Sequence, residues 1–407
     1  MQFGGPALHG HQQPYAWNCL HVQCGRRRQV RSEQATKRAG VPVLSQMNCR
    51  RQGLARGRVK APLVGIVANP ASGRDVRRLV AKASVFHTAE KCNMIQRALT
   101  ALAAVGVDEV LMMPDTGGIS AGVNRAITQN IAYQAQRWPK VSFIDIPIEN
   151  SAADSMRAVE HMVAVGVAVI IVMGGDGTHR VVASRCGKTP LVALSTGTNN
   201  AFPEIREATV AGLAAGLVAT EAVPLNGSTI SNKVLRLNLN GRHQELALID
   251  VCVTTDYWAG AKALWKPEDF RELFITVAKA DAIGLSAIGG LVHPVDRHAA
   301  HGLKLDLVPP APGVMTLQVA IAPGLIARVG VGKVHEIYPG EDWPLQTPRG
   351  MVALDGEREI EFGPQDHLAV SIHMDGPLTV DIGNVMKLAV ERQLFTETSA
   401  PETSKVV

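Results

Sequence analysis

The chain has 407 residues, which exceeds the size of one ordinary hydrophobic core and predicts two domains with extensions. Apolar residues make up 46% of the chain and aromatic residues only 4%, so the core must consist mainly of aliphatic side chains, as in buried parallel strands and their covering helices. The net charge of +5 does not indicate nucleic-acid binding, because residues 1–60 hold eleven of the 41 Lys and Arg residues but only one of the 36 acidic residues.

Residues 1–60 are basic and show no regular hydrophobic pattern. We expect a disordered or mis-assigned start, with a basic targeting segment or a nucleic-acid-binding arm as the alternatives. Six cysteines are scattered without a disulfide framework or the paired spacing of a zinc site, which favours a reducing, cytoplasmic location. No apolar run reaches the roughly 18 residues that a membrane-spanning helix needs, so we expect no membrane span.

From residue 61 to residue 223, apolar runs typical of buried strands alternate with segments of helical spacing. This alternation predicts an α/β domain with a doubly wound parallel sheet, whose ligands bind at the carboxyl ends of the strands. We expect strands at 63–68, 109–113, 141–146, 167–173 and 191–194, and helices at 89–105, 121–135 and 151–165.

Residues 224–365 show short alternating segments instead, which predict a mostly antiparallel, β-rich second domain with a helical insertion at 257–285. His293 and His298 lie near Asp296, but this spacing is loose for a metal site, and a solvated loop is the preferred interpretation. Residues 366–395 are expected to return to the first domain, and the polar tail 396–407 to be disordered. The strands and helix expected here are 233–239, 245–254, 314–321, 351–354, 368–373, 378–382 and 383–393.

The most informative motif follows the fourth predicted strand and reads Gly174-Gly175-Asp176-Gly177-Thr178. Three glycines allow a sharp turn with positive φ and bring main-chain N–H groups close to a phosphate, next to the positive end of a following helix. Thr178 is placed to cap that helix or to contact a phosphate. Asp176 puts a carboxylate where a substrate hydroxyl and a metal-bound triphosphate would meet. A plain turn between strand and helix is the alternative interpretation.

This motif resembles the signature of the NAD kinase and diacylglycerol or sphingosine kinase superfamily. Residues 69–74 (Asn-Pro-Ala-Ser-Gly-Arg) are similar to the Asn-Pro-x-Ser-Gly loop of its lipid-kinase branch, and residues 196–203 to its Gly-Thr-Gly-Asn-Asp-Phe segment. Residues 354–357 resemble the late Asp-Gly-Glu segment. The resemblance covers about 62–390 and is strongest to the ATP-NAD kinase-like family that includes acetoin catabolism protein X. His179 and Arg180 depart from the lipid-kinase pattern.

Each of these segments also has a chemical interpretation of its own, with an ordinary turn as the alternative. Short polar side chains, an exposed N–H and a guanidinium suit a phosphate. A cluster of hydroxyls and amides suits a nucleoside acceptor. Two carboxylates flanking a glycine suit Mg²⁺ bound through water. The predicted residues are, for phosphate, Asn69, Ser72, Gly73 and Arg74; for the acceptor, Thr196, Gly197, Thr198, Asn199 and Asn200; and for Mg²⁺, Asp355 and Glu357.

The resemblance implies a kinase that uses ATP, or polyphosphate, with Mg²⁺, and phosphorylates the 2′-hydroxyl of NAD to give NADP. It places Asp176 at the acceptor hydroxyl as general base or orienter. A kinase for a lipid or another small alcohol, linked to acetoin catabolism, is one alternative, and a non-catalytic nucleotide-binding regulator is another. The resemblance also implies a homo-oligomer.

Overall fold

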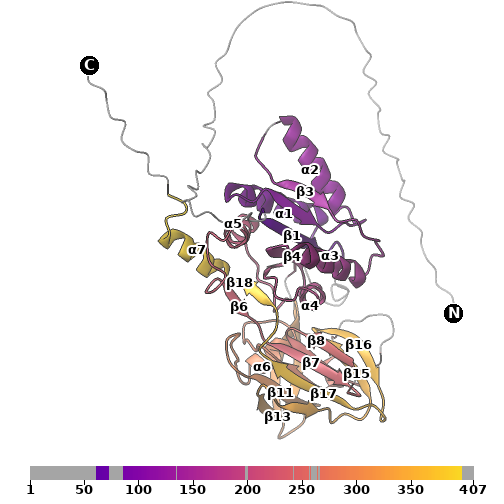
Figure 1. Ribbon diagram of the computed structural model, residues 1–407. Coiled ribbons are helices and arrows are strands. Elements are labelled where there is room, and N and C mark those ends of the chain that lie inside the picture. The colour runs from indigo at the N-terminus through magenta and orange to yellow at the C-terminus, as the bar shows by residue number, and fades with distance from the viewer. Residues whose placement is uncertain are drawn as a thin grey trace, which may run out of the picture. The chain divides into compact units, whose positions relative to one another are not determined.

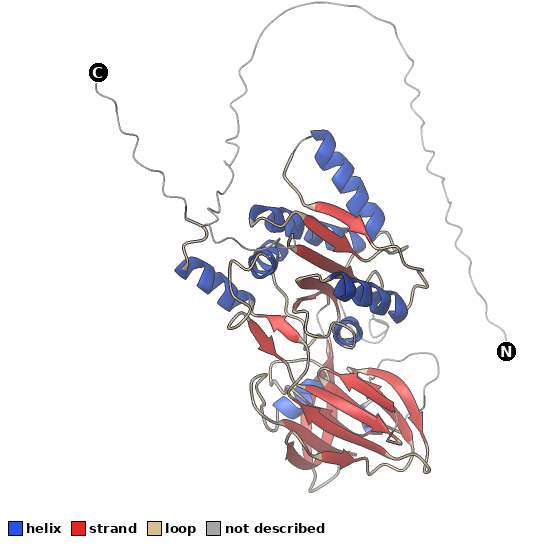
Figure 2. Ribbon diagram, in the orientation of Figure 1, coloured by secondary structure: helices blue, strands red, loops and turns tan. Residues whose placement is uncertain are grey.

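The computed structural model describes residues 61–72, 86–133, 135–197, 200–241, 243–255, 257, 264 and 266–396 (Figures 1 and 2). The predictions for residues 1–60 and for the tail from residue 397 therefore lie outside the described residues, as do four predicted site residues. These four are Gly73, Arg74, Thr198 and Asn199.

The first sheet is parallel across its first six strands, and the order of its strands reverses between β1 and β4. Such a reversal is the point at which doubly wound sheets bind ligands. The last strand in the order, β6, runs antiparallel to β18. In spatial order, the strands are β3 (Lys140–Phe143), β2 (Glu109–Met112), β1 (Leu63–Ala68), β4 (Val169–Gly174), β5 (Leu191–Ser195), β18 (Leu378–Val380) and β6 (Thr229–Ser231).

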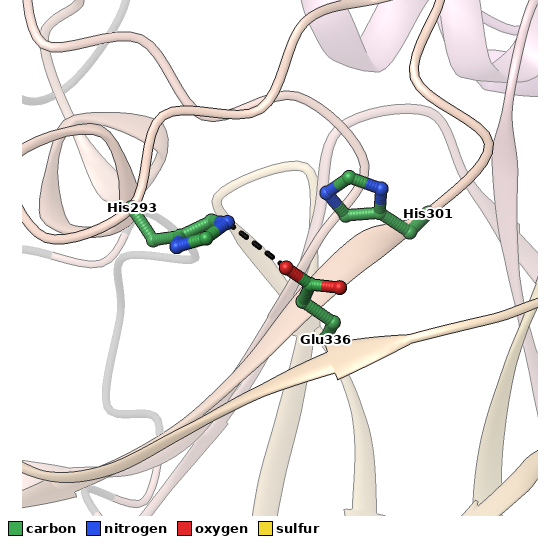
Figure 3. Close-up of side chains that lie close together, drawn as sticks. All are labelled: His293, His301 and Glu336. Carbon is green, nitrogen blue, oxygen red and sulfur yellow. Dashed lines mark ion pairs between the residues drawn. The ribbon is translucent and has the colours of Figure 1, made fainter.

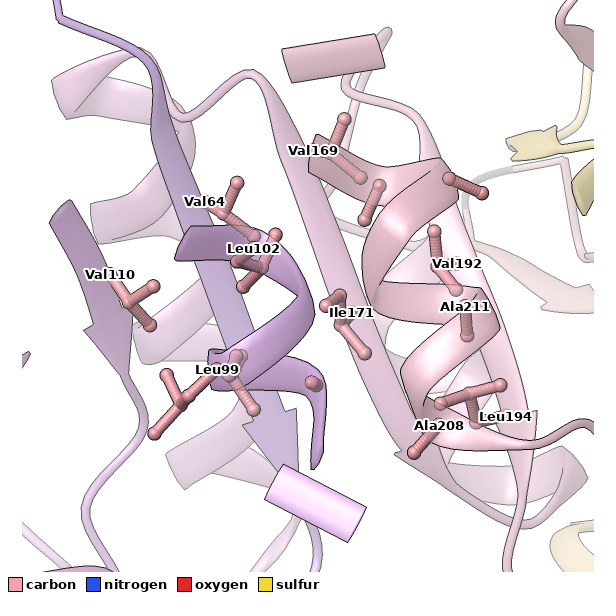
Figure 4. Packing of buried hydrophobic residues seen from close by; sticks show 14 of the residues in the cluster. Val64, Leu99, Leu102, Val110, Val169, Ile171, Val192, Leu194, Ala208 and Ala211 are labelled. Atoms are coloured by element: carbon pink, nitrogen blue, oxygen red, sulfur yellow. The ribbon is translucent and has the colours of Figure 1, made fainter. Parts of the chain in front are cut away.

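Helices cover both faces of this sheet, because alternate residues of its buried strands point to opposite sides. Val64 and Ile171 belong to the core shared with α1, α2, α5 and α7, whereas Val67 and Val172 belong to the core shared with α3 and α4. Figure 4 shows the first of these cores, with side chains of α1 and α5 packed against the strands. The helices are α1 (Thr88–Ala104), α2 (Ile119–Tyr133), α3 (Ala152–Val165), α4 (Asp176–Ala183), α5 (Ala208–Ala219) and α7 (Ile382–Glu391).

Local hydrogen bonds explain where α3 begins and ends. Ser151 accepts a hydrogen bond from Ala153 N, and Asp154 accepts one from Ser151 N, which forms a capping box at the start of α3. Gly166 ends the same helix with a φ of 77°.

The second domain is built from two antiparallel sheets that enclose a shared core, with side chains of β7, β9, β15 and β17 between them. A short helix, α6 (Leu285–Gly290), packs on the other face of the larger sheet. The larger sheet has the order β12 (Met315–Ala322), β13 (Leu325–Ile337), β11 (Gly302–Val308), β10 (Phe270–Ile275), β9 (Asp250–Thr254), β15 (Gly350–Leu354) and β16 (Glu357–Phe362). The smaller sheet has the order β14 (Asp342–Pro344), β17 (Leu368–His373), β7 (Val234–Leu239) and β8 (His243–Ala247).

The predicted fold class is therefore confirmed, including the return of the chain to the first sheet through β18 and α7. Two details differ. Strand β10 lies inside the segment 257–285 for which we expected a helix, because residues 270–275 pair with β9 and β11 as a mostly buried central strand. Strand β17 stays in the second domain, paired with β7, so the return begins later than residue 366.

Candidate active site

Three loops of the first domain meet at one edge of the sheet, because β1, β4 and β5 are parallel neighbours that all end there. Their main chains are joined directly. Asn69 N donates to Met173 O over 3.2 Å, and Thr196 N donates to Gly174 O over 3.1 Å. The loops after β1 and β4 therefore flank the reversal in strand order, where an α/β sheet presents its ligand-binding crevice.

Side chains from separate motifs complete this junction. Asn69 Nδ2 donates to Thr178 Oγ1 over 2.9 Å, and Ser72 Oγ lies 2.9 Å from Thr196 Oγ1. The sequence assigned these four residues to three segments far apart in the chain, and the structure brings them into one polar cluster.

The glycine motif turns β4 directly into α4, with Gly175 as the N-cap. None of Gly174, Gly175 and Gly177 has a positive φ, which corrects the expected reason for glycine. Close approach is the actual reason: a Cβ on Gly174 would lie 2.5 Å from Thr178 Cβ, and one on Gly175 would lie 3.0 Å from Asn200 Oδ1. The main chain can therefore approach both its own helix and the loop after β5.

Asp176 is the first residue of α4, and its carboxylate binds the loop after β5. Oδ1 accepts hydrogen bonds from Ala201 N over 3.1 Å and from Phe202 N over 2.9 Å, and Oδ2 accepts one from Ala201 N over 3.0 Å. Two N–H groups thus hold the carboxylate at the first turn of its own helix. Asp176 therefore holds two of the predicted site loops together.

The predicted acceptor segment is anchored through Asn200 and Ser195. Asn200 Nδ2 donates to Ser195 Oγ over 2.8 Å, and Ser195 Oγ donates to Gly197 O over 2.8 Å. These bonds join Ser195 to Gly197 and Asn200, and Asn200 lies beside Gly175 of the glycine motif. The acceptor-binding role of Thr196, Gly197 and Asn200 stays a prediction.

Lys91 is a residue that the sequence analysis missed. It lies in α1 with no exposed surface, and its Nζ donates to Asn69 O over 2.8 Å and to Ser72 O over 2.6 Å. A buried ammonium thus fixes the loop after β1 and adds positive charge beneath it. The available signal was periodicity, because Lys91 occupies the apolar face of α1 together with Ile95, Ala98 and others.

The second domain reaches the same loops through Arg297. This guanidinium donates to Phe202 O over 2.8 Å, to Ala201 O over 3.3 Å and to Asn232 Oδ1 over 2.8 Å, and it lies 5.2 Å from the centre of the Phe202 ring. Burial lowers the pKa of Arg297, while the carboxylates of Glu204 and Asp176 act in the opposite direction. Arg297 therefore binds the carbonyl oxygens of the same two residues whose N–H groups bind Asp176. No local pattern in the sequence marked it.

Asp355 lies in the tight turn between β15 and β16, where its φ is 50°. Its Oδ1 accepts hydrogen bonds from the amides of Leu248, Ile249 and Asp250 over 3.0, 2.8 and 3.2 Å, and Oδ2 lies 3.1 Å from Leu248 N and 3.8 Å from Arg180 Nε. Both oxygens are thus used within the protein, and burial raises the pKa of Asp355. This geometry does not fit direct binding of Mg²⁺ and gives Asp355 a structural use. Its metal-binding role stays a prediction.

Glu357 lies close to the glycine motif, since a Cβ on Gly177 would be 3.6 Å from its Oε1. Nearby, a small cavity that is partly open to solvent runs from Asp176 to the second domain. Its lining from the second domain is partly polar and partly apolar, and includes Asp250, Ser286 and Leu285. A small hydroxylated molecule in this cavity would lie against Asp176.

His179 is fully buried in α4, and its Nδ1 lies 2.8 Å from Gly175 O. Burial lowers the pKa of His179 to about 4, so the ring is neutral at physiological pH. Its ring contacts Phe202 with 5.7 Å between the centroids. His179 therefore packs against Phe202 in the loop after β5, and its neutral ring adds no positive charge for a phosphate.

None of the helices in the described part of the chain is both long and apolar enough to cross a membrane.

Two family models match the chain. Residues 64–222 match the ATP-NAD kinase N-terminal domain, and residues 233–375 match the acetoin catabolism protein X C-terminal domain. Acetoin catabolism protein X of Cupriavidus necator is 40% identical over 345 residues, which cover 84% of this chain and 96% of that protein.

Solved structures are similar at lower identity. Yeast NADH kinase complexed with NADH is 12% identical with a TM-score of 0.44, over 84% of this chain and 89% of that chain. A putative diacylglycerol kinase from Bacillus anthracis is 13% identical with a TM-score of 0.40, over 79% of this chain and 98% of that chain.

Proposed function

Because the chain belongs to the acetoin catabolism protein X family, we propose that it is a kinase that transfers a phosphoryl group from ATP to a hydroxyl of a small molecule. One observation carries the proposal: loops after three adjacent parallel strands form a single polar junction around the start of α4 and the carboxylate of Asp176. The match of residues 64–222 to an ATP-NAD kinase N-terminal domain supports it.

The phosphate groups are proposed to bind at the glycine motif. The first-turn amides of a helix have no partner within that helix and carry partial positive charge, so they bind anions. Asn69, Ser72 and Thr178 supply short polar groups beside these amides, and the ammonium of Lys91 lies beneath the same loop. Phosphoryl transfer depends mainly on positioning and charge stabilisation, which a rigid junction of this kind provides.

Asp176 is proposed to orient the acceptor hydroxyl and to accept its proton. Its carboxylate lines the cavity, while its bonds to Ala201 and Phe202 fix its orientation. Mg²⁺, carried by the ATP phosphates, would neutralise charge there, and Glu357 beside the glycine motif is the carboxylate we propose to face it through water.

The acceptor we favour is the 2′-hydroxyl of NAD, giving NADP, because the first domain matches an NAD kinase model. A second candidate is another small alcohol, one linked to acetoin catabolism. The second domain favours it, since residues 233–375 match a different model, that of acetoin catabolism protein X, and line most of the cavity beside Asp176.

The purified full chain should be incubated with radiolabelled ATP, Mg²⁺ and, separately, NAD, NADH, acetoin and a diacylglycerol, and the products identified by mass spectrometry. We expect label in one hydroxylated small molecule. Asp176→Asn should lower turnover at least a hundredfold while the variant still binds ATP.

Binding of ATP without transfer to any acceptor would indicate a nucleotide-binding regulator and refute the kinase. Near-normal turnover of Asp176→Asn would refute the role of its carboxylate. Asp281→Asn, at an exposed position of the second domain, is the matched control and should keep full turnover.

A further inference from the structure

A second cluster of titratable side chains lies in the second domain, outside the site described above. His293 follows α6, His301 directly precedes β11, and Glu336 is near the end of β13. One nitrogen of each histidine and one carboxylate oxygen all lie within 4.8 Å of one another. Figure 3 shows the His301 ring facing the pair formed by His293 and Glu336.

The fold places these residues together by pairing two strands. Leu303 of β11 is opposite Glu336 of β13, so His301 lies two residues away from the partner of Glu336. His293 is fixed from the other side, because its N–H donates to Gly289 O over 2.8 Å at the end of α6. The cluster therefore rests on a strand pair and a helix end.

The ring of His301 provides an independent observation. Its Nε2 is buried and has no hydrogen-bond partner among the described residues. A buried polar atom usually has such a partner, and the exceptions call for an explanation, such as a bound ion. Lys233 Nζ donates to His301 O over 2.8 Å and so fixes the main chain that carries this ring.

The carboxylate is also oriented. Tyr338 donates its hydroxyl to Glu336 Oε2, while Glu336 Oε1 lies 3.2 Å from His293 Nε2. A hydrogen bond that orients a carboxylate ligand in this way is typical of the surroundings of metal sites.

We propose that His293, His301 and Glu336 bind Zn²⁺, with a water molecule as the fourth ligand. Two imidazoles and one carboxylate are a common ligand set for zinc with an open position. Ligand atoms about 2.0–2.1 Å from a tetrahedral zinc ion lie roughly 3.3 Å apart. The separation of 3.2 Å between His293 and Glu336 already meets this, and only the His301 ring has to move closer.

The ion would link the two ends of the segment 293–301, because its ligands His293 and His301 are the first and last residues of that segment. Arg297 lies between them and bonds to Ala201 O and Phe202 O, next to the amides that bind Asp176. Zinc would therefore stabilise the position of Arg297 and, through it, the loop that binds Asp176. Only this consequence rests on the proposed function; binding of the ion does not.

The sequence analysis considered His293, His298 and Asp296 together and preferred a solvated loop. His298 and Asp296 do not join the cluster; instead, Asp296 Oδ1 accepts a hydrogen bond from His298 N over 2.8 Å within the loop. Only the pairing of β11 with β13 brings Glu336 to His293 and His301.

The untagged full chain should be stripped of metal with a chelator, and titrated with Zn²⁺ and, separately, Mg²⁺ by calorimetry. We expect one Zn²⁺ ion per chain at this site, no comparable binding of Mg²⁺, and a higher melting temperature with Zn²⁺. Co²⁺ in place of Zn²⁺ should give the visible absorption of a tetrahedral site.

His293→Asn, at an exposed position, and Glu336→Gln should each weaken this binding at least tenfold and abolish the gain in melting temperature. His298→Gln is the matched control and should bind as the wild type does. Zinc binding elsewhere in the chain would persist in both variants. The proposal is refuted if the wild type binds no Zn²⁺, or if His293→Asn and Glu336→Gln bind it with unchanged stoichiometry and affinity.

Discussion

The buried ammonium of Lys91 offers the sharpest test of the proposed phosphate site. Its Nζ is bonded to Asn69 O and Ser72 O, 2.8 and 2.6 Å away, at the loop after β1. Lys91→Met keeps the length of the aliphatic chain and removes the charge and its donors. The loop then loses its support from α1 without a change in the volume of the core.

The expected loss of stability follows from the contacts. A hydrogen bond from a charged donor contributes about 1.5–3 kcal/mol. Asn69 O keeps the hydroxyl of Ser72 as a donor, at 2.9 Å, so chiefly the bond to Ser72 O goes unreplaced. Since burying Met costs less than burying an ammonium, the gross loss is partly offset, and we expect the free energy of unfolding to fall by about 2 kcal/mol.

Binding of ATP should suffer separately, because the variant removes a positive charge beneath the phosphates and loosens Asn69 and Ser72. We expect the Kd for ATP to rise at least tenfold, which corresponds to about 1.4 kcal/mol. Urea unfolding measures the first effect, and calorimetric titration with ATP measures the second without an acceptor. Lys387→Met, at an exposed position of α7, is the control and should change neither quantity.

Unchanged affinity for ATP in Lys91→Met would refute the assignment of this loop to phosphate binding. A fall in stability alone would then leave Lys91 with a purely structural role.

Three further outcomes are expected. Gly174→Ala places a Cβ 2.5 Å from Thr178 Cβ, so it should lower the free energy of unfolding by about 2 kcal/mol and weaken the binding of ATP. Gly383→Ala in α7 is the control and should be neutral or stabilising. Thermal unfolding compares the two variants. Because burial lowers the pKa of His179 from 6.5 to about 4, the unfolded chain binds an extra proton between these pH values. Stability should therefore fall by up to about 3 kcal/mol as pH decreases from 6.5 to 4, and His179→Asn should flatten that part of a urea-unfolding profile. Asp355→Asn replaces an acceptor that faces the amides of residues 248–250 by a donor, and should cost about 2 kcal/mol of unfolding free energy in the same measurement. Added Mg²⁺ should not change this difference; stabilisation of the wild type but not of the variant by Mg²⁺ would instead favour a metal-binding role.

The architecture of the first domain and the place of its polar motifs could both be predicted from the pattern of residues along the chain. Apolar runs fix the buried strands, and parallel strands joined by helices all end at one edge of a sheet. The motifs at Asn69, Gly174 and Thr196 each follow such a strand, so their convergence could be predicted without coordinates. Glycine was predicted correctly as a requirement of the motif but for the wrong reason, since close approach to Thr178 depends on packing and not on φ.

The residues that support those motifs could be identified only from the packing of segments that are distant in the chain. Lys91 is an ordinary helical lysine until α1 packs beneath the loop after β1, and Arg297 has no role until the second domain lies against Ala201 and Phe202. Asp355 likewise finds its amide partners only after β9 and β15 pair. Local periodicity records which face of an element is buried. It does not record which distant segment covers that face, because hydrogen bonds of this kind form between residues whose separation in the chain carries no pattern.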